Sequence, residues 1–204
     1  MKRAYRLIAP VALAALVSAC SIFPKAEPSD VYRLASAQTT SRATPVTWSL
    51  RVNKPQTSEF LDSPRIAVVP NGDLISSYAS SRWSDPAPVL LRNRFMDGFQ
   101  RDGRVTLLST DDTNLQADYE LGGQLQAFQS EYRGNALEVV IRLDARLVRG
   151  RDQRIVASRR FEIRQPVSDT KVPAVVTGFG QAGDQLNKQV VDWVVAQGNS
   201  ASKG

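Results

Sequence analysis

Three consecutive segments in the second half of the chain alternate between apolar and polar residues, and this pattern limits the fold more than any other feature. A period of two residues predicts strands with one buried side and one solvent-facing side. The stretches YRGNA and RGRDQR between the segments are rich in turn-forming residues. The pattern therefore predicts three long antiparallel strands joined by short turns. The apolar positions are Tyr119, Leu121, Gly123, Leu125 and Ala127, then Leu137, Val139, Ile141, Leu143, Ala145 and Leu147, then Ile155, Ala157, Phe161 and Ile163.

Helical periodicity follows these strands and also occurs once before them. Apolar residues recur at steps of three and four from Val172 to Ala196, which predicts an amphipathic helix packed on the sheet. A first helix is predicted from Asp85, a good N-cap residue, to Gly103, a typical C-terminal signal. Further strands are predicted at Val46–Val52, Pro64–Asn71 and Arg104–Thr110.

The order of these elements predicts an α+β fold, with a single antiparallel or mixed β-sheet of about five to six strands and two α-helices packed on one face. The globular domain is expected at residues 45–197, followed by a disordered tail at 198–204. Residues 20–44 are rich in Pro, Ser, Thr and Ala and predict a flexible tether, in which Val31–Leu34 could dock as a short strand.

Residues 1–19 have the three-part layout of a secretory signal peptide. Basic residues come first, an apolar run spans Leu7–Val17, and small residues follow. The run is shorter than the roughly 20 residues that a membrane-spanning helix needs. The expected cleavage site lies between Ala19 and Cys20, the only cysteine of the chain.

The sequence VSAC at Val17–Cys20 resembles a bacterial lipobox. That resemblance implies a diacylglycerol on the Cys20 thiol and an N-acyl lipid on its new amino group, with no other cofactor. Two or three acyl chains anchor a protein stably, whereas one holds only marginally. Ser21, in place of an aspartate, resembles the pattern of lipoproteins sorted to the outer membrane. The alternative is an ordinary signal peptide followed by a free thiol.

The charge of the chain gives no sign of a nucleic-acid partner. The 26 basic and 20 acidic residues give a net charge of +6, and 23 basic residues remain when Lys2, Arg3 and Arg6 leave with the signal peptide. Acids and bases are well mixed, as on a solvated surface. The chain has no histidine, the usual general base and commonest metal ligand. We therefore expect neither an enzyme nor a metal site.

The stretch SSRWSDPAP, residues 80–88, is the main candidate contact site. A polar loop with Arg82 beside Trp83 could present a partner surface, since Trp and Arg are common interface anchors. Alternatively, Trp83 covers the end of the helix and Arg82 is solvated. A second candidate surface is the polar side of the long strands, with Arg142, Arg146 and Arg160.

Glycines in two stretches look like phosphate-binding loops only superficially. Gly122–Gln124 lies in a predicted strand with no helix start after it, so a bulge or close packing is expected. Thr177–Gly183 lies in a predicted helix, where its glycines favour close packing on the sheet.

From about Trp48 to Ala196 the chain resembles the ABC-type transport auxiliary lipoproteins, the PqiC-like family. The resemblance is carried by LDSPRIAVVPNGDLI, SSRWSDPAPVLLRNRF, ADYELGGQLQAF and the final VVDWVVAQ. Phe60 stands where the family often has a tyrosine. This resemblance implies a non-enzymatic lipoprotein of the outer membrane, facing the periplasm, that docks an MCE-domain periplasmic protein of an envelope lipid transport system.

Two other functions compete with this interpretation. One is a lipid- or glycolipid-binding lipoprotein that assembles with an outer-membrane barrel, which predicts an apolar cavity or a basic groove. The other is an envelope hydrolase that uses serine with lysine or an acid. Exposed strand edges would also allow a homo-oligomer.

Overall fold

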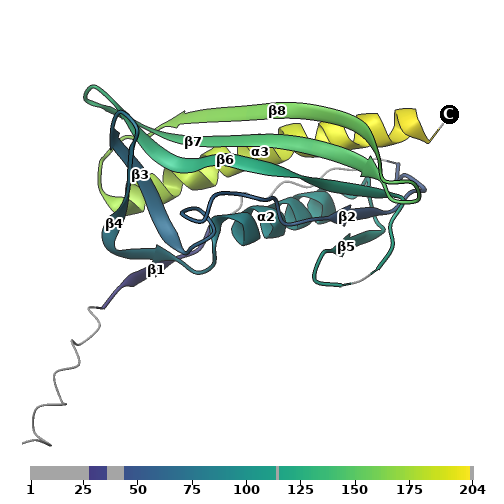
Figure 1. Cartoon of the computed structure of the whole chain (residues 1–204), viewed down its shortest axis with the longest axis horizontal. Coiled ribbons are helices and arrows are strands. Elements are labelled where there is room, and N and C mark those ends of the chain that lie inside the picture. The colour runs from purple at the N-terminus through teal and green to yellow at the C-terminus, as the bar shows by residue number, and fades with distance from the viewer. Residues whose placement is uncertain (1–27, 36–43, 114, 203–204) are drawn as a thin grey trace, which may run out of the picture.

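The computed structural model describes residues 28–35, 44–113 and 115–202. These residues form one eight-stranded mixed sheet and two helices (Figure 1). The predicted α+β class is confirmed, with more strands than expected. The strands are β1 (Asp30–Tyr32), β2 (Leu50–Val52), β3 (Arg65–Asn71), β4 (Leu74–Trp83), β5 (Leu108–Thr110), β6 (Tyr119–Arg133), β7 (Ala136–Arg149) and β8 (Arg154–Pro166), and the helices are α2 (Ala87–Asp102) and α3 (Val172–Ala201).

The three alternating segments form the antiparallel strands β6, β7 and β8, which arch over α3 in Figure 1. Leu143 pairs with Leu125 on one side and with Phe161 on the other, and all three are buried. A register shift between Leu125 and Ala127 changes the parity of β6. Ala127 therefore pairs with Arg142, on the other side of the sheet from Leu125, yet it is buried as predicted, at 1% exposed.

The second edge of β6 carries two separate groups of strands. Near its start β6 pairs in parallel with β2, through Leu50 and Tyr119, and β5 lies beyond β2. Near its end β6 pairs in parallel with β3, through Ala67 and Gln129, and the order continues outward through β4 to β1. The predicted strand at Arg104–Thr110 shortens to β5, and that at Val46–Val52 shortens to β2.

Strand β4 was not predicted, and its last four residues, Ser80–Trp83, fall in the predicted polar loop. Its side chains are mostly exposed or half-buried, so no apolar alternation marks it in the sequence. Backbone pairing fixes it instead, because β4 is antiparallel to β3 on one edge and parallel to β1 on the other.

Both helices differ from prediction at one end. Gly103 ends α2 in the left-handed conformation, φ 73°, as predicted. At its start Pro86 occupies the N-cap position and no side chain caps the helix, so the expected capping by Asp85 is wrong. The Asp85 carboxylate accepts a hydrogen bond from the Ser84 hydroxyl instead, at 2.9 Å. Helix α3 continues to Ala201, into the predicted tail.

The glycines of α3 allow close packing, as predicted. A Cβ on Gly178 would lie 3.2 Å from a methyl group of Val139 on the sheet. A Cβ on Gly183 would lie 3.0 Å from Arg94 Nε on α2, so this glycine serves the contact between the helices. In β6 a Cβ on Gly123 would lie 2.1 Å from the Asp144 carbonyl oxygen, which confirms the close packing expected there.

Candidate functional site

Cys20 and Ala19 lie outside the described residues, and the first described element after them is β1. Strand β1 pairs in parallel with β4, with Asp30 opposite Ser81. The Ser84 backbone N–H also donates to the Tyr32 carbonyl at 2.8 Å. Part of the predicted 20–44 tether is therefore built into the sheet, as the docking of Val31–Leu34 anticipated.

Arg94 on α2 connects this segment to α3. Its side chain is 1% exposed. The guanidinium donates to the carbonyl oxygens of Ala35 and Gly180, the latter at 2.9 Å, and forms an ion pair with Asp184. Burial lowers the pKa of Arg94, and the negative charge of Asp184 opposes that shift. A single buried cation thus holds the N-terminal segment, α2 and α3 together.

Sequence reasoning missed Arg94, although one signal for it was present. Arg94 follows Leu90 and Leu91 at helical steps of four and three, so it falls on the apolar stripe of α2. A charged residue on such a stripe is buried and needs a partner. Gly183 leaves room for it on the facing helix.

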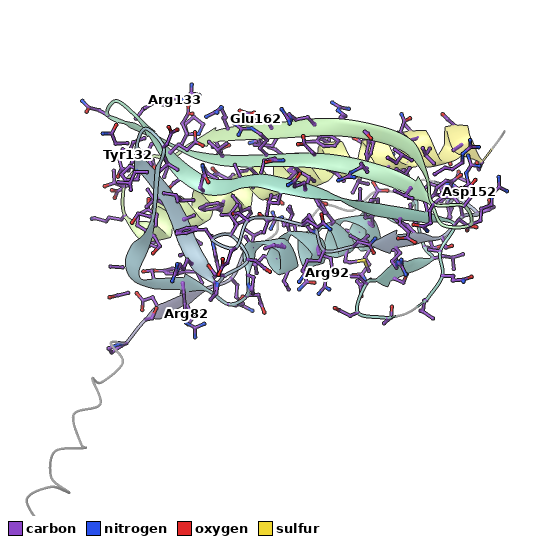
Figure 2. The ribbon with its side chains drawn as sticks, in the orientation of Figure 1. Arg82, Arg92, Tyr132, Arg133, Asp152 and Glu162 are labelled. Atoms are coloured by element: carbon purple, nitrogen blue, oxygen red, sulfur yellow. The ribbon has the colours of Figure 1, made fainter. Side chains whose placement is uncertain are left out.

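The structure separates the two residues of the predicted contact pair. Arg82 is exposed near the end of β4, and Figure 2 shows it at the lower edge of the molecule, close to β1. Trp83 is 0% exposed and packs edge-on against Phe179, with ring centroids 5.1 Å apart, and against Phe128. The expectation that Trp83 presents a partner surface is therefore wrong for this fold: its indole fills the core between sheet and helix.

The outer face of β6–β8 carries a network of ion pairs. Arg142 meets Glu162 at 2.7 Å, and Arg160 meets Asp144 at 2.6 Å. Hydrogen bonds from these arginines lower the pKa of both carboxyl groups. Arg146 is exposed on the same face, opposite Ser158. Two of the three predicted contact arginines are thus paired with acids, and the face has mixed charge. The network continues through Arg164, Glu131 and Glu138.

An open cleft of about 900 Å³ lies between the β7–β8 turn and the end of α3, at the end of the molecule away from β1 (Figure 1). Asp118 accepts hydrogen bonds from the backbone N–H and hydroxyl of Ser49, both at 2.8 Å, and these lower its pKa. Arg51 pairs with Glu120 at 2.8 Å. The cleft is therefore polar and its charges are largely paired. Its lining also includes Trp48, Tyr119, Arg149 and Arg151.

The described residues contain no group of three or more His, Cys, Asp or Glu that could hold a metal ion. The hydroxyls of Tyr78 and Ser130 lie 3.0 Å apart, and burial raises the pKa of Tyr78. No described helix is long and apolar enough to cross a bilayer. The arrangement offers surfaces for contact: a mixed-charge face, a polar cleft and an N-terminal segment fixed to the body.

The sequence matches the family described as ABC-type transport auxiliary lipoprotein component over residues 32–191. The chain belongs to this family. The resemblance drawn from the sequence motifs is thereby confirmed, and the family's description is that of an auxiliary component of transport.

Solved relatives of this auxiliary lipoprotein agree with the fold. The crystal structure of protein XCC0632 from Xanthomonas campestris, of the family DUF330, has a TM-score of 0.81 at 31% identity, covering 86% of this chain and 100% of that one. A crystal structure of an uncharacterized protein has a TM-score of 0.61 at 15% identity, covering 82% and 99%, and it shows the fold alone.

A curated relative is longer than this chain. An uncharacterized protein of Bradyrhizobium diazoefficiens is 30% identical over 148 residues, which make up 72% of this chain and 39% of that protein. The chain therefore spans well under half of that relative.

Proposed function

We propose that this auxiliary lipoprotein is anchored in the outer membrane by lipids on Cys20, faces the periplasm, and is a non-enzymatic docking component of an ABC-type, MCE-linked lipid transport system. The family match over residues 32–191 carries the proposal, because it assigns the folded domain to transport auxiliary lipoproteins. The lipobox-like Val17–Cys20 supports acylation, and Ser21 supports sorting to the outer membrane.

The fixed N-terminal segment supports a docking role, because it shortens the tether. A free chain from Cys20 to residue 44 would reach about 80 Å when extended. Since β1 begins at Asp30, only the chain from Cys20 to Asp30 can extend, and it reaches at most about 35 Å. Acyl chains on Cys20 would therefore keep the domain close to the membrane, as a docking component requires.

The partner we propose is an MCE-domain periplasmic protein, and two exposed surfaces suit it. Arg82 stands near the anchored segment, and the outer face of β6–β8 presents Arg142, Arg146 and Arg160 among acids. Complementary charge of this kind favours specificity and encounter rate. Among the described residues β8 pairs only with β7, so its free edge also suits a homo-oligomer.

The barrel-assembly alternative is less well supported. A lipid- or glycolipid-binding module needs a cavity with a largely apolar lining. The open cleft instead exposes Arg51, Asp118, Glu120 and Arg151, with acids and bases both present. These groups suit contact with a polar protein surface better than enclosure of an acyl chain.

Cross-linking in the intact envelope, followed by affinity purification and mass spectrometry, tests the proposal. We expect the wild type to recover an MCE-domain protein, and Cys20→Ala to lose it because the domain is no longer held at the membrane. Arg82→Glu should weaken recovery if the partner binds beside the anchor. Arg154→Glu is its matched control, since Arg154 is an exposed arginine at the start of β8, at the opposite end and outside the cleft lining.

Recovery of a barrel protein or a bound glycolipid, with no MCE-domain protein, would support the assembly module instead. Recovery of the same partner by Cys20→Ala at the wild-type level would remove the need for an anchor. In that case the outer-membrane part of the proposal fails.

A further inference from the structure

Two hairpin turns and the start of α3 meet at one end of the molecule. Val69 on β3 pairs in parallel with Glu131 on β6, so the β3–β4 turn and the β6–β7 turn lie at the same level. The Val167 backbone N–H donates to the Leu137 carbonyl at 2.9 Å, which brings the segment before α3 to that end. Strand β1 lies beside the other end of β4, at the lower left of Figure 1: Asp30 pairs with Ser81, which is seven residues, or about 23 Å, from Leu74 along the strand.

The β3–β4 hairpin exposes two adjacent large apolar residues at this end. Leu74 is 63% exposed and Ile75 is 37% exposed, directly after the turn at Gly72 and Asp73. Neighbouring residues of a strand point to opposite sides. A flat protein partner would cover only one of them, whereas an interfacial lipid layer that takes up the tip of a hairpin contacts both.

The length of chain before β1 places this hairpin within reach of the bilayer. Lipids on Cys20 would lie at most about 35 Å from Asp30 along an extended chain. The same end carries exposed Lys171 and Arg133, whose long side chains can reach lipid phosphates. Asp73 in the turn limits how deeply the hairpin tip can enter the bilayer, because a carboxylate is costly in hydrocarbon.

From these observations we propose that the β3–β4 hairpin tip, with Leu74 and Ile75, is a second membrane contact that lies in the headgroup region and orients the anchored domain. This inference rests on the proposed lipid anchor. Two apolar side chains are too few to hold a soluble domain at a membrane. Tethering by Cys20 supplies the high local concentration at which so weak a contact forms.

Fluorescence quenching by brominated lipids tests the contact on the full, lipidated chain. The probe is an environment-sensitive dye on Leu74→Cys, in vesicles of phosphatidylethanolamine and phosphatidylglycerol. Ile155→Cys is the matched control, because Ile155 is 59% exposed and is the second residue of a strand that follows a hairpin turn, at the opposite end. The chain has one cysteine, and acylation blocks its thiol, so only the introduced cysteine takes the dye.

We expect quenching at position 74 to exceed that at position 155 by at least about twofold, and to disappear when Cys20→Ser removes the anchor. Equal quenching at the two positions overturns the inference, as does no quenching at position 74 while the protein still floats with the vesicles. Either result would indicate that the tip contacts a protein partner instead of lipid. If the wild type takes the dye at Cys20 and does not float, the lipid anchor itself fails. The two failures are therefore distinguishable.

Discussion

Replacing Arg94 by methionine tests whether one buried cation fixes the N-terminal segment to the two helices. Methionine keeps most of the length that fills the space over Gly183, but it cannot donate a hydrogen bond. The substitution removes the bonds to the carbonyls of Ala35 and Gly180 and the ion pair with Asp184.

The expected loss of stability follows from the burial of the two partners. Removing one member of a buried ion pair costs about 3–5 kcal/mol. Asp184 is 35% exposed, so water can solvate its charge once the arginine is gone. This places the loss at the lower end, about 3 kcal/mol. The matched control is Arg142→Met on the outer face, where breaking an exposed ion pair costs about 1 kcal/mol or less.

Urea unfolding measures the loss of stability, and limited proteolysis measures the detachment of the N-terminal segment. Arg33 follows β1 and is exposed, so trypsin can cleave there once the segment detaches. Arg94→Met should speed cleavage after Arg33, and Arg142→Met should leave it unchanged. A loss no larger than that of Arg142→Met, with unchanged cleavage at Arg33, would refute the role assigned to Arg94.

Further substitutions test the packing and the ionisation of the fold. A Cβ on Gly198 would lie 2.5 Å from an indole atom, so Gly198→Ala should lower the free energy of unfolding by about 1–3 kcal/mol in urea. Gly180→Ala, with an ordinary contact at 3.6 Å, should raise it by up to about 1 kcal/mol. Trp83→Ala should lower it by about 3–5 kcal/mol, because Trp83 is fully buried. Exposed Arg82→Ala should change it by about 0.5 kcal/mol or less. Because the folded-state pKa of Asp118 is lowered, this group stabilises the fold above its unfolded pKa of about 4 and loses that effect as the pH falls. Asp118→Asn should therefore flatten the acid decline of the melting temperature.

The sequence predicted the half-buried strands and the amphipathic helices, because burial on one side leaves a period that can be counted. β6 and β7 show a period of two over most of their length, and α3 shows steps of three and four. In β8 only Phe161 and Ile163 follow the predicted alternation into the core, and Ile155 is exposed. The end of α2 was predicted because a left-handed C-cap favours glycine, and Gly103 adopts it.

Elements that are not buried on one side show no such period in the sequence. β4 is exposed on both sides for most of its length, so its serines looked like a loop. The burial of Trp83 depends on the parity of that strand, which was not visible without β4 itself. Arg94 was missed because its partners, Ala35 and Asp184, are 59 and 90 residues away along the chain. No local pattern encodes contacts over such separations.

Arg82 and the polar cleft lie at different distances from the hairpin end, so a partner on one or on the other predicts docking at different heights above the membrane. Helix α3 has 30 residues and is about 45 Å long, and it runs from the hairpin end to the cleft end. With the hairpin tip held at the bilayer, a partner on Arg82 meets the domain up to about 26 Å from the tip, because Arg82 is eight residues from Leu74 along β4. A partner in the cleft meets it about 45 Å from the hairpin end, at the far end of α3. Cross-links from a photoreactive residue at position 82 or 151 therefore distinguish the two arrangements. Contact at 82 alone places the transport partner at the end of the domain nearer the outer membrane. Contact at 151 alone places the partner at the end farther from that membrane, with the domain as a spacer between them.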